Sequence, residues 1–75
     1  MIITGEQIKA ARKLLGWSQM TLALEANMAT QTVANIEKGE KSRSSGLTVS
    51  TVKRTLEQAG IEFRDGEPPR LKPTR

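Results

Sequence analysis

Within its 75 residues the chain contains neither cysteine nor histidine, and this absence restricts how it can fold. A domain of this length buries only about 60% of the surface that its unfolded chain exposes, so its stability starts near the margin. Small folds often compensate with disulfides or a structural metal ion, and both need residues that are missing here. We therefore expect one helix-packed domain with no metal and no cofactor.

The first two helices are predicted by clear start signals. Thr4 with Gln7 three residues later forms a capping box for a helix of about Gly5 to Leu15. Ser18 is the cap of a second helix, about Gln19 to Ala26. Each helix has apolar residues at helical spacing that predict an inward face, namely Ile8, Ala11 and Leu15 in the first, and Leu22, Ala23 and Ala26 in the second.

A sharp turn joins the second helix to a third of about Thr30 to Lys38. Asn27 follows the second helix directly, and asparagine tolerates the left-handed backbone conformation that such a turn needs. Gly39 ends the third helix. Because the connection has only three or four residues, we expect the two helices to cross steeply.

A fourth helix is predicted from Val49 to Ala59, after a Ser- and Gly-rich loop over residues 39–47. Thr48 is its expected cap, with Leu47 and Val52 as the hydrophobic pair around that cap. Together these elements predict an all-α class, a compact four-helix domain.

The C-terminal segment has a different pattern. Ile61, Glu62 and Phe63 alternate as in a short strand, Asp65-Gly66 is a turn signal, and residues 70–72 could return as a second strand. Three prolines weaken regular pairing. We expect a domain over residues 1–64 and a basic, proline-containing tail over 65–75, either a short β-hairpin or an extended segment.

The chain is basic and carries no membrane signal. Twelve Lys and Arg oppose eight Asp and Glu, a net charge of +4, which favours a polyanionic partner. We find no apolar run long enough to cross a membrane and no signal-peptide pattern at the start of the sequence. The basic residues gather in two groups, Lys38, Lys41, Arg43, Lys53 and Arg54, and Arg64, Arg70, Lys72 and Arg75.

The run QMTLALEANMATQTVANIEKGE resembles the helix-turn-helix core of the phage-repressor family, also called the Cro-type or XRE family. The resemblance covers roughly residues 4–64. It implies a DNA-binding transcriptional regulator whose third helix enters the major groove. The matching positions are Gln19, Leu22, Ala23, Val33, Ile36, Glu37 and Gly39.

Two positions depart from the family's pattern. Asn27 stands where the family has a turn glycine, and Ala29 where it has a Ser or Thr cap. Alanine cannot accept the free amide hydrogens, and a lost cap typically costs about 1 kcal/mol. Thr30 is an alternative cap one residue later, which would move the start of the third helix.

The resemblance also assigns roles. Positions matching Thr30, Gln31 and Asn35 commonly touch bases, those matching Gln19 and Thr32 commonly touch phosphates, and Arg12 pairs with Glu37. Helical phase agrees with these roles, since it places Val33 and Glu37 inward and Gln31 and Asn35 outward.

Side-chain chemistry extends the predicted contact surface. Gln and Asn amides complement adenine, and Ala34 could meet a thymine methyl group. Basic and polar residues that continue past the helix could hold phosphates, namely Lys38, Lys41, Ser42 and Arg43. Each assignment has a simpler alternative. Gln31 and Asn35 could be solvated surface amides, and Lys41 and Arg43 could belong to an ordinary solvated loop.

An enzyme is disfavoured because His, Cys and Tyr are absent and the carboxylates are scattered. An antitoxin-like or cofactor-like module remains as the alternative, binding a protein partner or a second copy through Ile61, Phe63 and Leu71. We predict a sequence-specific regulator, with repression favoured, that binds a palindromic double-stranded DNA site as a homodimer in the cytoplasm of a bacterial or phage system.

Overall fold

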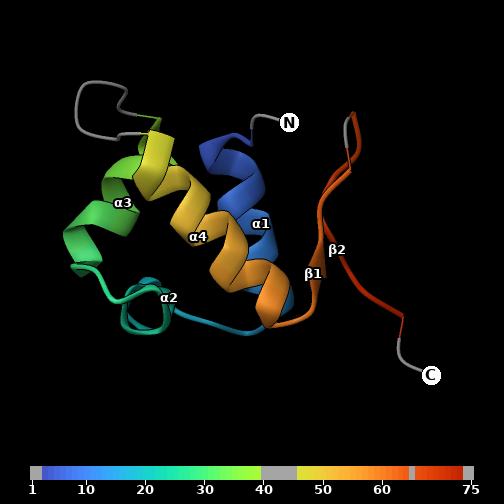
Figure 1. Ribbon diagram of the computed structural model, residues 1–75, viewed down its shortest axis with the longest axis horizontal. Helices are drawn as coiled ribbons and strands as arrows, with labels where there is room; N and C mark the ends of the chain where they lie inside the picture. The colour runs from blue at the N-terminus through green and yellow to red at the C-terminus, as the bar shows by residue number, and fades with distance from the viewer. Residues whose placement is uncertain (1–2, 40–45, 65, 74–75) are drawn as a thin grey trace.

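The computed structural model describes residues 3–39, 46–64 and 66–73, and it confirms the predicted all-α class with an added hairpin (Figure 1). None of the described helices is long and apolar enough to cross a membrane. The elements in chain order are α1 (Gly5–Leu14), α2 (Gln19–Ala26), α3 (Thr30–Lys38), α4 (Gly46–Gln58), β1 (Ile61–Glu62) and β2 (Arg70–Leu71).

The starts of the first two helices form as the capping signals predict. The Thr4 hydroxyl accepts from the Gln7 backbone N–H at 3.2 Å, and the Gln7 side chain accepts from the Thr4 N–H at 2.8 Å. The Ser18 hydroxyl accepts from the backbone N–H of Thr21 at 3.1 Å. The bonds at α1 are reciprocal, whereas Ser18 accepts a single bond at α2; both kinds satisfy amide hydrogens that a helix start leaves free, so the two helices begin at defined residues.

The turn between α2 and α3 also has the predicted geometry. Asn27 adopts the left-handed conformation with φ of 60°, and α3 begins only three residues later. Ala29 is the N-cap residue and has an extended conformation. Its side chain is a methyl group, so it makes no cap hydrogen bond. Thr30 is the first helical residue, so the alternative cap at this position is not used and α3 keeps its expected start.

The start of α4 was predicted wrongly. The helix begins at Gly46, which places Thr48 inside its first turn and not at the cap. Leu47 is 78% exposed, so it does not form the expected apolar pair with Val52, which is fully buried. The helix was expected to end at Ala59 and ends at Gln58.

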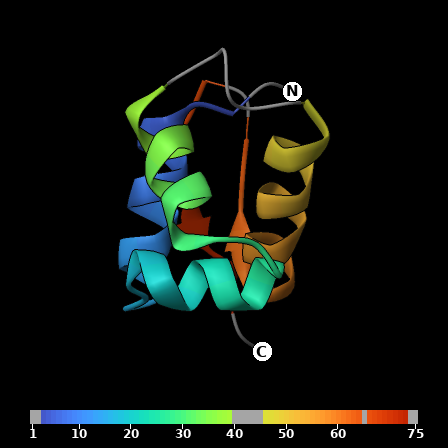
Figure 2. The same cartoon turned by 90° about the vertical axis from the view of Figure 1, so that its left-hand side faces the viewer.

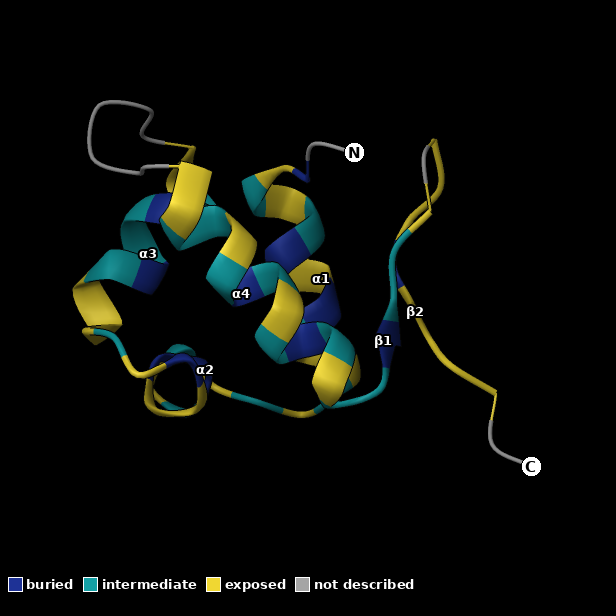
Figure 3. Cartoon of the chain, in the orientation of Figure 1, coloured by how far each residue is buried: buried dark blue, intermediate teal, exposed yellow. Residues whose placement is uncertain are grey.

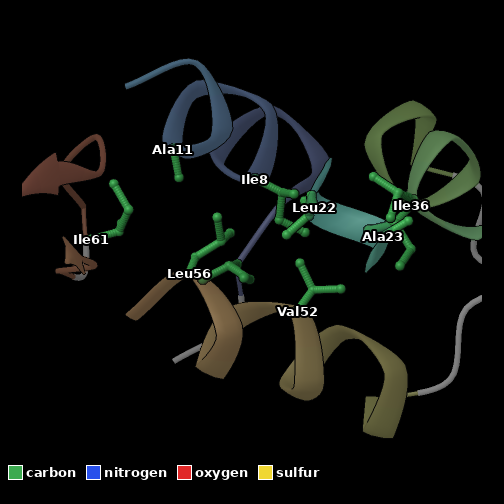
Figure 4. Packing of buried hydrophobic residues seen from close by; sticks show 10 residues of the cluster. Ile8, Ala11, Leu22, Ala23, Ile36, Val52, Leu56 and Ile61 are labelled. Atoms are coloured by element: carbon green, nitrogen blue, oxygen red, sulfur yellow. The ribbon is translucent and has the colours of Figure 1, made fainter. Parts of the chain in front are cut away.

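One apolar core joins the four helices and β1. Buried residues line the inner faces of the helices, and exposed positions lie outside (Figure 3). Side chains from all these elements meet in the interior, as the close view shows (Figure 4). The cluster consists of Ile3, Ile8, Ala11, Leu22, Ala23, Val33, Ile36, Val52, Leu56 and Ile61, with Leu15, Trp17, Met28, Val49 and Phe63 packed at its edge.

The C-terminal hairpin closes the end of the domain opposite α3 (Figure 1). Its strands are antiparallel, with Ile61 opposite Leu71 and Glu62 opposite Arg70. A further backbone bond of 2.7 Å joins the Lys72 N–H to the Gly60 carbonyl. Because Ile61 is fully buried, β1 is part of the core, and the hairpin holds the second strand against α1.

Candidate nucleic-acid interface

Helix α3 is held by its apolar side and exposes the opposite side. Val33 is fully buried and Ile36 nearly so, whereas Gln31 and Lys38 are exposed and Asn35 is half-buried. In Figure 2, where the left-hand side of Figure 1 faces the viewer, α3 lies in front of α1 and above α2, which runs across the bottom of the view. A rigid helix presented this way matches the width of the major groove of B-DNA.

The start of α1 packs against the end of α3 at Gly5. A side chain there would place its Cβ 2.6 Å from the carbonyl oxygen of Glu37 and also against the carbonyl oxygen of Ile36. Only glycine allows this approach, which brings the positive end of the α1 dipole to the negative end of α3. Sequence reasoning had assigned Gly5 no role, because the contact depends on how two distant helices pack.

A partly buried ion pair joins the same two helices. Arg12 donates from Nε to Glu37 Oε2 at 2.8 Å and from Nη2 to Oε1 at 3.1 Å. Its Nη1 donates to the carbonyl oxygen of Trp17 at 2.9 Å. The side chains are only 11% and 4% exposed, respectively, so water screens the pair weakly. The two-pronged geometry fixes the angle between α1 and α3.

Gln19 is part of this network. Its Nε2 donates to Glu37 Oε1 at 3.1 Å, so Glu37 receives hydrogen bonds from α1 and from α2. Gln19 is the first residue of α2 and is half-buried, and the bond to Glu37 restrains its amide at that helix start. Sequence reasoning treated Gln19 only as a phosphate candidate and missed this bond, because the two residues are far apart in the sequence.

The predicted base-contact residues occupy one side of α3. Thr30 and Gln31 are exposed, and Ala34 and Asn35 are half-buried. The amides of Gln31 and Asn35 bond to each other, with Gln31 Nε2 donating to Asn35 Oδ1 at 2.9 Å. The structure therefore brings these two side chains together as a pair, one helical turn apart.

The predicted phosphate-contact residues are described only in part. Thr32 is half-buried and Lys38 is exposed at the last turn of α3. Three of the candidates lie outside the described residues, namely Lys41, Ser42 and Arg43.

The prediction of an apolar contact surface at the C-terminus is wrong for Ile61. Ile61 is fully buried in the domain's own core, since its side of β1 faces α4, so it is not available to a partner. Leu71 is 50% exposed and Phe63 is half-buried against the core. Hydrogen bonding from Arg70, joined by Arg64, lowers the pKa of Glu62 on the same hairpin. Part of the second basic group is thus neutralised locally.

A family model described as helix-turn-helix matches residues 8–57, which extend from within α1 nearly to the end of α4. No curated protein matches the sequence.

Proposed function

Because the chain belongs to the Cro- and XRE-type helix-turn-helix family, whose members are DNA-binding regulators of transcription, we propose that it binds specific double-stranded DNA sequences. Helix α3 lies in the major groove. The observation that carries this proposal is the division of α3 into a buried side, Val33 and Ile36, and an outward side with the paired amides of Gln31 and Asn35. Amides can both donate to and accept from base edges.

We divide the contacts into two groups. The outward residues of α3 touch bases, namely Thr30, Gln31, Ala34 and Asn35. Residues around them hold the phosphates, namely Gln19, Thr32, Lys38, Lys41, Ser42 and Arg43. Phosphate contacts set position and affinity, whereas base contacts select the sequence.

One recognition helix covers only a few base pairs, so useful specificity requires two copies. A two-fold dimer would place its recognition helices about 34 Å apart, on successive turns of a palindromic site. The hairpin lies at the end of the domain opposite α3, so a dimer joined there would hold its recognition helices far apart (Figure 1). We therefore infer a seam nearer to α3. A protein bound in this way at a promoter in the bacterial cytoplasm acts as a repressor, by occupying the site.

The test is selection of bound sequences from a random DNA pool, followed by a salt titration on the selected site. We expect enrichment of a short inverted repeat, and an affinity that falls log-linearly with salt by about 0.9 in slope for each neutralised phosphate. Lys38→Ala should lower that slope by about 1 without changing the selected sequence. Lys72→Ala, an exposed lysine on the hairpin, is the matched control and should leave the slope unchanged.

Absence of DNA binding even at low salt would contradict the proposal. It would favour the rival function, a module that binds a protein partner.

A further inference from the structure

Strand β2 lies at the edge of the sheet, and its outer side is open. Within the described part of the chain the sheet has two strands, so β2 has one side paired with β1 and one side free. Leu71, in the middle of this segment, is 50% exposed. A free edge presents unpaired N–H and C=O groups to which a strand of a second copy can add. Whether a second copy pairs there depends on which groups this edge offers.

The register determines which residues form the outer edge. Lys72 donates its backbone N–H to the Gly60 carbonyl at 2.7 Å. Arg70, two residues earlier, lies opposite Glu62, so the N–H groups of Arg70 and Lys72 point toward β1. These directions alternate along a strand, so the N–H and C=O of Leu71 point away from β1, and no hydrogen bond engages either within the described residues. The outer edge therefore consists of Leu71 and the positions two residues before and after it.

Proline occupies both of those flanking positions. Pro69 and Pro73 carry no N–H, and the ring of each takes the place where the hydrogen would point. Pro69 is buried, like Ile61, which lies opposite Leu71, and this agrees with the alternation along the segment. Along this edge, only Leu71 keeps a backbone donor.

Pairing of β2 with the β2 of a second copy would depend on the missing donors. In a two-fold arrangement centred on Leu71, position 73 of one copy faces position 69 of the other. Proline at both positions removes the hydrogen bonds on either side of the central pair. The same arrangement sets Arg70 opposite Lys72 of the second copy, and like charges placed opposite each other destabilise a strand pair.

We propose that Pro69 and Pro73 close the β2 edge to strand addition and so prevent the hairpin from joining two copies of the chain. This inference does not depend on DNA binding. It concerns the C-terminal surface that was expected to contact a partner or a second copy, and it removes pairing of two β2 strands through Leu71 from the ways in which that surface acts. It agrees with a dimer seam nearer to α3.

Pro73→Thr tests the inference, because Pro73 is exposed and threonine suits a strand. The change restores an N–H in each copy, facing the Pro69 carbonyl of the other. Two added hydrogen bonds should raise the association constant of the variant by about tenfold over that of the wild type. Sedimentation equilibrium measures this constant, and circular dichroism checks that the variant keeps its helices.

Hydrogen exchange followed by NMR separates strand pairing from association at another surface. In the wild type, the Leu71 N–H should exchange at a rate that does not depend on protein concentration. In Pro73→Thr, the same N–H should exchange more slowly as the concentration rises. Pro68→Thr is the matched control, because Pro68 is also exposed but alternates with Pro69 and is not part of the outer edge. It should behave as the wild type.

Three results would overturn the inference. The first is a wild-type Leu71 N–H that becomes protected as concentration rises, because the edge would then pair despite its prolines. The second is a Pro73→Thr variant with wild-type exchange at Leu71. The third is equal protection in Pro68→Thr, which would mean that the phase of the proline along the strand is irrelevant. A wild type that fails to bind DNA would contradict the proposed function and leave this inference standing.

Discussion

Glu37→Gln removes the charge from the ion pair between α1 and α3 and keeps the size of the side chain. With side chains 11% and 4% exposed, the variant leaves the Arg12 charge largely out of water and without its counter-ion. Breaking a buried pair in this way costs about 3–5 kcal/mol. Glutamine still offers one oxygen to Arg12, so we take the lower end of that range. In a domain of this size, about 3 kcal/mol corresponds to a fall in Tm of at least about 12 °C.

Thermal and urea unfolding followed by circular dichroism measure this loss. The matched control is Glu57→Gln, which breaks a surface pair in α4 with Lys53 at 3.1 Å, where the side chains are 37% and 31% exposed, respectively. Exposed pairs of this kind contribute about 1 kcal/mol or less. Equal small losses in the two variants would refute the reasoning, because they would mean that burial adds nothing to the cost of the unpaired charge.

A double change separates charge from packing. Combining Arg12→Met with Glu37→Leu removes both charges and fills the site with apolar atoms, which is often close to neutral for a buried pair. We expect the double variant to be more stable than Glu37→Gln alone. A double variant that is less stable would show that the hydrogen bonds to Trp17 and Gln19, and not the stranded charge, carry the effect.

Three further changes test other parts of the fold. Gly5→Ala should lower the unfolding free energy in urea melts because its methyl group would meet the last carbonyls of α3, whereas Gly46→Ala, with open space around it, should be neutral or slightly stabilising. Ala29→Ser should raise that free energy by about 1 kcal/mol, since an acceptor is added at an N-cap that has none. The pKa of Glu62, followed by NMR, should lie below its ordinary value and rise in Arg70→Ala. Because folding lowers that pKa, the stabilisation from Glu62 is present above the unfolded pKa and is lost as pH falls through the folded one.

Local signals were sufficient for the part of the fold that positions α3. Helices α2 and α3 begin and end at the predicted residues, because Ser18 caps the first and Asn27 makes the left-handed turn between them. These features act within a few residues of chain, so a pattern of residue types determines them. Ala29, the N-cap residue of α3, makes no side-chain cap bond, and the helix still starts at Thr30. We attribute this to the burial of Val33 and Ile36, which stabilises the helix without the cap.

The cap signal at Thr48 did not determine where α4 begins. Thr48 is a good cap type, yet α4 starts at Gly46, two residues earlier. The sequence also did not predict the burial of Ile61, because alternation along β1 indicates a strand but not whether its apolar side packs on the domain's own helices or on a partner. In the fold, that side of β1 packs against α4, so Ile61, which was proposed to contact a partner, lies in the domain's own core.

The candidate interface shows the same limit at the level of single atoms. The spacing of Gln31 and Asn35 predicts that their amides are neighbours, but an amide can donate or accept, and spacing does not determine which it does. In the structure Gln31 Nε2 is the donor and Asn35 Oδ1 the acceptor. Because an amide oxygen has two lone pairs, Asn35 can still accept a second hydrogen bond from a base. Both side chains therefore keep a donor and an acceptor for base edges, so the bond restrains their conformations and leaves their base-reading chemistry intact.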